Sequence, residues 1–201
     1  MPALAQTEQK YKLETKQDAI KLIDAASKGD TEAVQKLKSL KAFNKDEVNK
    51  LLKDVKLTAA DRTKKFDFGD GSSIVIRMEL FDNEQIGNED RELQTGHVTW
   101  YFTYEVEVAG VMVAEYLLWQ SYQIDGTNDL SQGYSWDSGS GCPPYGVNKY
   151  GTSDQKTKGT YVKATGNGGI SCFGYEYISV TIIGYCYDDP ANENWCQFYT
   201  S

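Results

Sequence analysis

The sequence has 201 residues and a net charge of −8, enough chain for one domain or for a domain with a helical appendage. Residues 1–65 contain 15 basic and 10 acidic residues, whereas residues 66–201 contain 6 basic and 19 acidic residues. The second part should repel the phosphates of nucleic acids, which excludes nucleic acid as its partner. The basic first part is expected to dock on the acidic body, to bind an anionic surface such as a membrane, or simply to expose a solvated lysine-rich face.

We expect a flexible N-terminus over residues 1–14 and two or three short helices over residues 15–63. Thr15, Asp30 and Asn44 each precede a run with helical spacing of apolar residues, and each can accept hydrogen bonds from the first turn of a helix. Each predicted helix is shorter than the ~12–15 residues that persist alone in water. The helices must therefore pack on one another or on the rest of the protein, or lie at a membrane interface.

Residues 64–201 have the two-residue periodicity of β-strands. The strongest signal is a pair of runs, His97 to Val108 and Val111 to Ile124, joined by Ala109-Gly110. A two-residue turn there predicts that Val108 faces Val111 and that the pairing continues outward. Strict alternation then gives a core face that holds Val98, Trp100, Phe102, Tyr104, Val106, Val108, Val111, Val113, Glu115, Leu117, Trp119 and Ser121.

The fold class that these patterns predict is α+β and mainly β. We expect an antiparallel β-sandwich or jelly-roll-like body over residues 64–201, preceded by the short N-terminal helical segment. Residues 125–154 are rich in Gly, Ser, Asp and Asn and are expected to form a long loop. Tyr134, Trp136 and Tyr145 lie in this stretch and are the predicted ligand-binding residues, suited to stack on sugar rings or to fill a partner's pocket. The alternative is that they cover one end of the sandwich.

The strict register also places Glu115 on the apolar face, opposite Tyr104. A desolvated carboxyl there would have the raised pKa of a general acid, and Glu176, between two tyrosines, is a candidate partner. Glu115-Tyr116 followed by Trp119 resembles the nucleophile strand of family-11-type xylanases, and that resemblance implies a jelly-roll glycosidase. The alternative is a bulge or register slip that turns Glu115 toward solvent, with no catalytic role.

All four cysteines lie in the last 60 residues, in a region rich in Gly, Asn and Tyr. An even number of cysteines without a CxxC spacing favours two disulfides over a zinc site. We expect Cys142 to pair with Cys172 and Cys186 with Cys196. Ala3-Leu4-Ala5 has the small-x-small form of a signal-peptide cleavage site, so we expect a secreted protein whose signal was removed; an ordinary cytosolic start is the alternative.

The sequence lacks several common catalytic sets. Its single histidine, His97, leaves no His-rich metal site and restricts any Ser-His-Asp triad to that residue. It contains no GxGxxG, P-loop or GxSxG motif, so we expect no cofactor and no bound metal.

Three functions are consistent with these features. The first is a secreted, non-enzymatic binding protein, expected as a monomer, whose exposed aromatic residues recognise a protein or a carbohydrate. The second is a secreted toxin or antimicrobial effector whose basic helices engage a membrane. The third is a small glycoside hydrolase that uses Glu115 and Glu176. The long Tyr-rich hairpin, the Gly/Ser-rich stretch and the clustered cysteines look like those of small secreted proteins of Gram-positive bacteria, a resemblance that implies no particular activity.

Overall fold

The computed structural model describes residues 13–86, 95–125, 130–157, 161–172, 175–187 and 195–200. Its helices are α1 (Lys16–Ser27), α2 (Thr31–Lys38), the 3-10 helix η1 (Lys41–Phe43) and α3 (Lys45–Leu52). The predicted caps are confirmed, since the side chains of Thr15, Asp30 and Asn44 accept backbone N–H groups at the starts of α1, α2 and α3.

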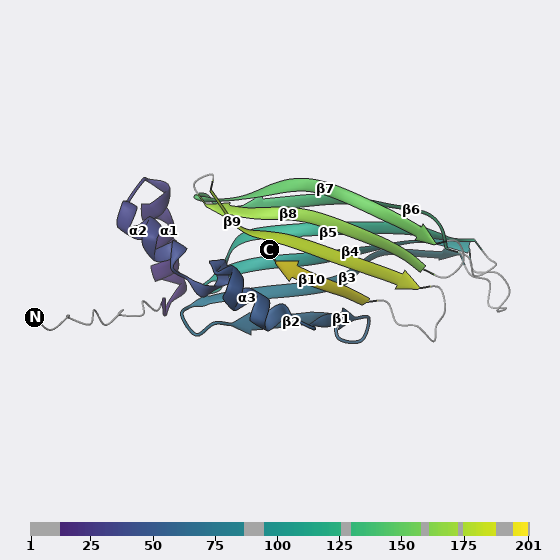
Figure 1. The fold of residues 1–201 in the computed structure, drawn as a ribbon, viewed down its shortest axis with the longest axis horizontal. Coiled ribbons are helices and arrows are strands. Elements are labelled where there is room, and N and C mark those ends of the chain that lie inside the picture. Colours follow the sequence, from purple (N-terminus) through teal and green to yellow (C-terminus); the bar gives the residue numbers. More distant parts are fainter. Residues whose placement is uncertain are drawn as a thin grey trace, which may run out of the picture.

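In the described part of the chain, the strands form two five-stranded antiparallel sheets that pack as a sandwich (Figure 1). Sheet A has the order β1-β10-β9-β8-β7 and sheet B the order β2-β3-β4-β5-β6. Consecutive strands are neighbours through most of both sheets, so the body is a sandwich of two meanders and not a jelly roll. The strands are β1 (Lys56–Thr58), β2 (Thr63–Asp67), β3 (Ser72–Ile86), β4 (Thr95–Val108), β5 (Val111–Asp125), β6 (Leu130–Gly141), β7 (Tyr145–Thr157), β8 (Tyr161–Cys172), β9 (Tyr175–Tyr187) and β10 (Trp195–Thr200).

Three of these strands differ from the prediction, in two respects. Strand β1 lies inside the range that was expected to be helical and pairs with β10 of sheet A. Strands β6 and β7 occupy most of the stretch that was predicted to be a long loop. Glycine explains the second difference, because a Cβ at Gly139 would come within 2.5 Å of Val147 and one at Gly141 within 2.9 Å of the Tyr145 carbonyl. These glycines allow β6 and β7 to approach closely and do not mark a loop.

The core lies between the sheets, where large side chains of sheet B meet glycines of sheet A. Tyr116 and Phe102 are fully buried. A Cβ at Gly168 would come within 2.5 Å of the Tyr116 ring, and one at Gly184 would overlap the Phe102 ring. The glycines of β8 and β9 therefore provide the space that the aromatic side chains of β4 and β5 fill.

The helical segment packs at one end of the sandwich, where Figure 1 shows α1 and α2. Asp70, in the turn between β2 and β3, fixes this end because its Oδ2 accepts the N–H of Lys41 (2.8 Å) and its Oδ1 accepts the hydroxyl of Ser72 (2.6 Å). The backbone N–H of Leu13 donates to the Asp70 carbonyl (3.0 Å). Helices and strands thus share one hydrophobic core. The helices were expected to pack in this way because they are too short to persist alone.

The β4–β5 hairpin has the predicted turn but not the predicted faces. Val108 pairs with Val111, yet the register shifts beyond the turn so that Val106 pairs with Ala114, which leaves Val113 as an extra residue in β5. The extra residue reverses the alternation along the rest of β5. Its even-numbered residues from Ala114 to Gln120 face the core, and Glu115, Leu117 and Trp119 face outward. The prediction that Glu115 and Trp119 belong to the core face is wrong for this reason.

Candidate ligand-binding surface

Five aromatic side chains form one continuous cluster on the outer face of sheet B, which we call the aromatic ridge. The Trp119 and Trp136 rings are stacked, with centroids 5.5 Å apart and planes 5° apart. Tyr134 stacks on Trp136 at 5.4 Å, while Phe81 meets Trp119 edge-on at 5.1 Å and Tyr101 lies 5.0 Å from Trp119. The ridge therefore crosses four strands, from β3 to β6.

Strand register and bulges place these rings side by side. Trp119 is the cross-strand partner of both Tyr101 on β4 and Trp136 on β6. Phe81 is the extra residue of a register shift between Leu80 and Asp82 in β3. Cross-strand neighbours have Cβ atoms about 5 Å apart, which explains the spacing of the rings.

The ridge is a large exposed apolar feature. Phe81 is 66% exposed, Tyr134 55% and Trp136 39%. A contiguous exposed apolar patch on a protein surface is typical of a site that binds a ligand, another protein or a membrane. Aromatic side chains also carry much of the binding energy at characterised interfaces.

Strand β6 is held in place at the edge of the sandwich by polar contacts with β7. The backbone N–H of Ser135 donates to Asp154 Oδ2 (3.1 Å), and the hydroxyl of Thr152 donates to the Ser135 carbonyl (3.1 Å). Asp137 Oδ2 accepts the N–H of Gly151 (3.3 Å). These contacts fix the backbone on which Tyr134 and Trp136 lie, so the ridge has a rigid support.

Charged side chains lie beside the ridge on the same face. Arg77 forms an ion pair with Glu105, and Lys65 forms one with Glu107 (2.5 Å). Burial opposes ionisation of Glu107, but hydrogen bonds from Lys65 and Ser73 outweigh it and lower the pKa of this carboxyl.

Two further carboxylates on this face, those of Glu79 and Glu115, have no cationic partner among the residues that the structure describes. Glu79 accepts a hydrogen bond from the Tyr101 hydroxyl. Burial, that hydrogen bond and the negative charge of Glu79 raise the pKa of Tyr101 to about 12, and Glu115 adds to the effect. Glu115 is the cross-strand partner of Glu105, a like charge.

The predicted ligand-binding residues separate into two locations. Tyr134 and Trp136 lie on the ridge, but Tyr145 is buried and stacks on Phe43 (4.9 Å) beside the helices. Trp119, Tyr101 and Phe81 were not among the predicted residues. Trp119 had been assigned to the core face, and only the bulge at Val113 reveals its true orientation.

The proposed catalytic pair is not brought together. Glu115 is on the outer face of sheet B, whereas Glu176 lies on β9 of sheet A. The side chain of Glu176 is outside the described residues. Because Glu115 faces away from sheet A, the two cannot flank one glycosidic bond inside the sandwich.

His97 contacts a serine that the sequence did not single out. Ser121 Oγ lies 2.5 Å from His97 Nε2, and the hydroxyl of Thr99 donates to Ser121 (3.2 Å). A nucleophile must reach its substrate, but Ser121 is fully buried. The arrangement fits a structural hydrogen-bond chain beneath the surface.

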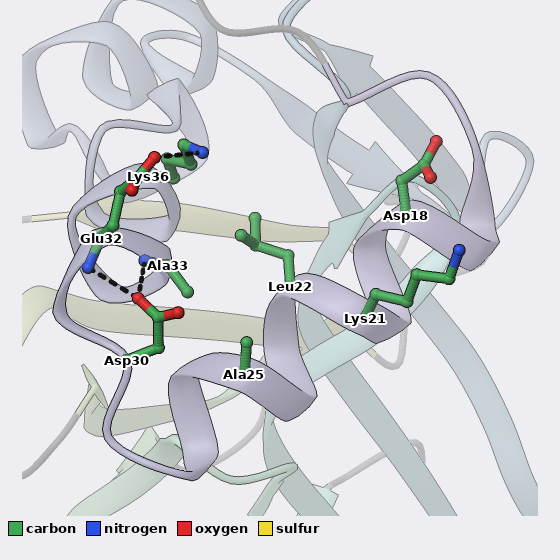
Figure 2. Close-up of a pocket in the computed structure, with 8 residues that line it drawn as sticks. All are labelled: Asp18, Lys21, Leu22, Ala25, Asp30, Glu32, Ala33 and Lys36. Atoms are coloured by element: carbon green, nitrogen blue, oxygen red, sulfur yellow. Dashed lines mark hydrogen bonds and ion pairs between the residues drawn. The ribbon is translucent and has the colours of Figure 1, made fainter.

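A groove of 350 Å³ lies between α1 and α2 (Figure 2). Three of its charged side chains have local partners: Asp30 Oδ1 accepts the N–H groups of Glu32 and Ala33, and Glu32 forms an ion pair with Lys36 (2.7 Å). These groups stabilise the start of α2 and do not converge on a common point in the groove.

The structure shows neither predicted disulfide, because Cys142 and Cys186 both carry free thiols. Cys186 is buried with its Sγ 3.5 Å from Gln120 Oε1, and burial raises the pKa of the thiol. The register nevertheless brings the expected partners near: Cys196 pairs with Gly184, two residues from Cys186, and Cys172 pairs with Tyr145, three residues from Cys142. The side chains of Cys172 and Cys196 are outside the described residues.

Within the described ranges, no group of three or more His, Cys, Asp or Glu side chains is arranged to hold a metal ion. No described helix combines the length and the apolar character needed to cross a membrane. Comparisons with protein-family models, with curated proteins and with solved structures give no match.

Proposed function

We propose that this protein is a non-enzymatic binding protein whose ligand docks on the aromatic ridge. The observation that carries the proposal is the ridge itself, five contacting rings on the outside of a sandwich, of which Phe81, Tyr134 and Trp136 are exposed. Exposing such a surface loses the stabilisation that burial would give, so a functional reason is expected. Secretion is part of this proposal and rests on the sequence features alone.

The arrangement of the polar groups supports binding over catalysis. Glu105 and Glu107 are held in ion pairs, and Ser121 is buried beneath the surface. Hydrolysis of a glycosidic bond needs two carboxyl groups on opposite sides of the substrate. Glu115 and Glu176 belong to different sheets, which leaves the glycosidase hypothesis with little support.

A membrane-active effector has less support for a similar reason. Most apolar residues of the helices are directed into the protein, with Ile23, Leu37 and Val48 buried, and only Ile20 and Leu51 are exposed among the large apolar residues of the described helices. An interfacial helix needs its apolar face free to enter the lipid. The lysines of these helices can still contribute to an electrostatic surface.

A binding screen with matched variants tests the proposal. Wild type, Trp136→Ala and Tyr150→Ala are applied to a glycan array and to a panel of immobilised proteins and peptides. Tyr150 is 56% exposed on β7 and is not one of the contacting rings of the ridge, so it controls for the loss of an exposed aromatic side chain. We expect ligands whose binding falls about thirtyfold in Trp136→Ala, the effect of losing about 2 kcal/mol, and is unchanged in Tyr150→Ala. If Trp136→Ala affects no ligand that the wild type binds, the proposal fails.

A further inference from the structure

The outer face of sheet B has an imbalance of charge beside the aromatic ridge. Strands β3, β4 and β5 direct four glutamates onto this face, and the described cations beside them are Arg77 and Lys65. Each cation is already paired with a glutamate, which leaves Glu79 and Glu115 without a cationic partner among the described side chains. The ridge therefore lies in a field that is negative on balance.

The two uncompensated carboxylates flank the rings. Glu79 lies on β3 and accepts a hydrogen bond from the hydroxyl of Tyr101. Glu115 lies four residues before Trp119 on β5, a separation of about 13 Å along a strand. Leu117 lies between them on the same face and is partly exposed, so an apolar track connects Glu115 to the indoles.

The rings and the carboxylates favour the same kind of ligand. The face of an aromatic ring carries partial negative charge and attracts an ammonium or guanidinium group. A carboxylate without a counter-ion attracts the same groups more strongly. A cationic ligand is therefore favoured by both parts of the surface, whereas an anionic ligand, including an acidic lipid headgroup, is opposed by both.

We propose that the ligand of the aromatic ridge is a basic polypeptide segment whose lysine or arginine side chains reach Glu79 and Glu115. This inference rests on the proposed function and specifies its partner. Lysine and arginine combine an aliphatic stem, which packs along the rings and Leu117, with a charged head at the end, which meets a carboxylate. The described hollows lie elsewhere, between α1 and α2 and beside the β2–β3 turn, so the ridge suits an extended segment more than a small enclosed ligand.

The test measures binding of a fluorescently labelled oligo-arginine peptide to the full-length protein at low and at physiological salt. The variants are Trp136→Ala, Glu115→Gln and, as a control, Glu32→Gln on the exposed surface of α2. Glu115→Gln and Glu32→Gln change the net charge equally, so a difference between them reports a local interaction. Oligo-glutamate, a chitosan oligomer and a neutral cello-oligosaccharide are measured in parallel, and sedimentation velocity measures self-association.

We expect Trp136→Ala to weaken oligo-arginine binding about tenfold or more and Glu115→Gln about fivefold. Glu32→Gln should change binding less than about twofold, and oligo-glutamate should not bind. Equal effects of Glu115→Gln and Glu32→Gln would overturn the proposal, since they would show attraction to net charge alone. So would Trp136-dependent binding of the chitosan or cello-oligosaccharide in place of the peptide, or self-association through the ridge. In those cases the ridge remains the proposed binding surface, but its partner is not a basic peptide. If no ligand that the wild type binds depends on Trp136, both the proposed function and the proposed basic partner are refuted.

Discussion

Replacing Gly168 with alanine tests how the sandwich core is built. Gly168 lies on β8 opposite the fully buried Tyr116, and an added Cβ would come 2.5 Å from two carbons of the Tyr116 ring. Carbon atoms in contact prefer separations of about 3.5–4.0 Å, so the ring or the strand must shift. The ring has little freedom because it is enclosed between the sheets and its hydroxyl donates to Asp137 Oδ2 (3.3 Å).

Overpacking of this kind costs about 1–3 kcal/mol, and we expect about 2 kcal/mol for Gly168→Ala. For a chain of this size that loss lowers the melting temperature by about 4–8 °C. The assay is thermal unfolding followed by circular dichroism, with urea unfolding as a second measure. Gly146→Ala is the matched control, because a Cβ on that β7 glycine would meet only the Ser171 hydroxyl, at 3.2 Å.

The Tyr116→Leu background separates a clash from a general intolerance of alanine. If the clash with the ring is the cause, Gly168→Ala should cost about 1–2 kcal/mol less in Tyr116→Leu than in the wild type. Equal stability of Gly168→Ala and Gly146→Ala would refute the reasoning. A cost that persists unchanged in the Tyr116→Leu background would also refute it.

Three further predictions follow from individual side chains. Tyr104→Phe should raise the free energy of unfolding by about 1 kcal/mol in urea titrations, because the buried Tyr104 hydroxyl has no hydrogen-bond partner among the described residues; a loss of stability would show that the hydroxyl is satisfied. The lowered pKa of Glu107 means that its ion pair stabilises the fold at neutral pH and that this contribution disappears as the pH falls through the folded-state pKa. Lys65→Met should therefore cost less than about 1 kcal/mol at pH 7 and nothing at low pH, and an equal cost at both pH values would contradict this. Cys142, which is partly exposed, should react with iodoacetamide in the native protein, whereas the buried Cys186 should react only after unfolding; failure of both to react without reductant would indicate disulfides.

Much of the fold could be predicted from local chemistry. Helix starts at Thr15, Asp30 and Asn44 depend on side chains that satisfy nearby N–H groups, and the structure has these caps. The turn at Ala109-Gly110 is indicated by Gly110, because glycine readily adopts the positive φ that both residues of this turn have. Such features are determined within a few residues, so the sequence is sufficient to predict them.

The site could be predicted only in part, because one bulge reverses the faces of a long strand. Alternation assigns Trp119 to the core, and no residue near Val113 signals that an extra residue breaks the pairing there. Tyr134 and Trp136 were selected because they are aromatic residues in a Gly/Ser-rich stretch, but their neighbours on the ridge come from strands that pair only in three dimensions.

The prediction of a loop in the Gly/Ser-rich stretch was wrong for a related reason. Glycine in a sequence suggests a turn, whereas at Gly139 and Gly141 it permits close contact between β6 and β7. The distinction depends on what lies opposite each glycine, which local sequence does not encode. Two strands, β6 and β7, were therefore predicted to be a loop in the region that carries Tyr134 and Trp136.

Oxidative footprinting with and without the tightest ligand from the binding screen tests the central claim most directly. Hydroxyl radicals modify exposed aromatic side chains, and mass spectrometry reports the change at Tyr134, Trp136 and the control Tyr150, all of which are exposed in the free protein. Bound ligand should protect Tyr134 and Trp136 and leave Tyr150 unchanged. Protection of Tyr150 with none at Tyr134 and Trp136 would contradict the assignment of the aromatic ridge as the binding surface.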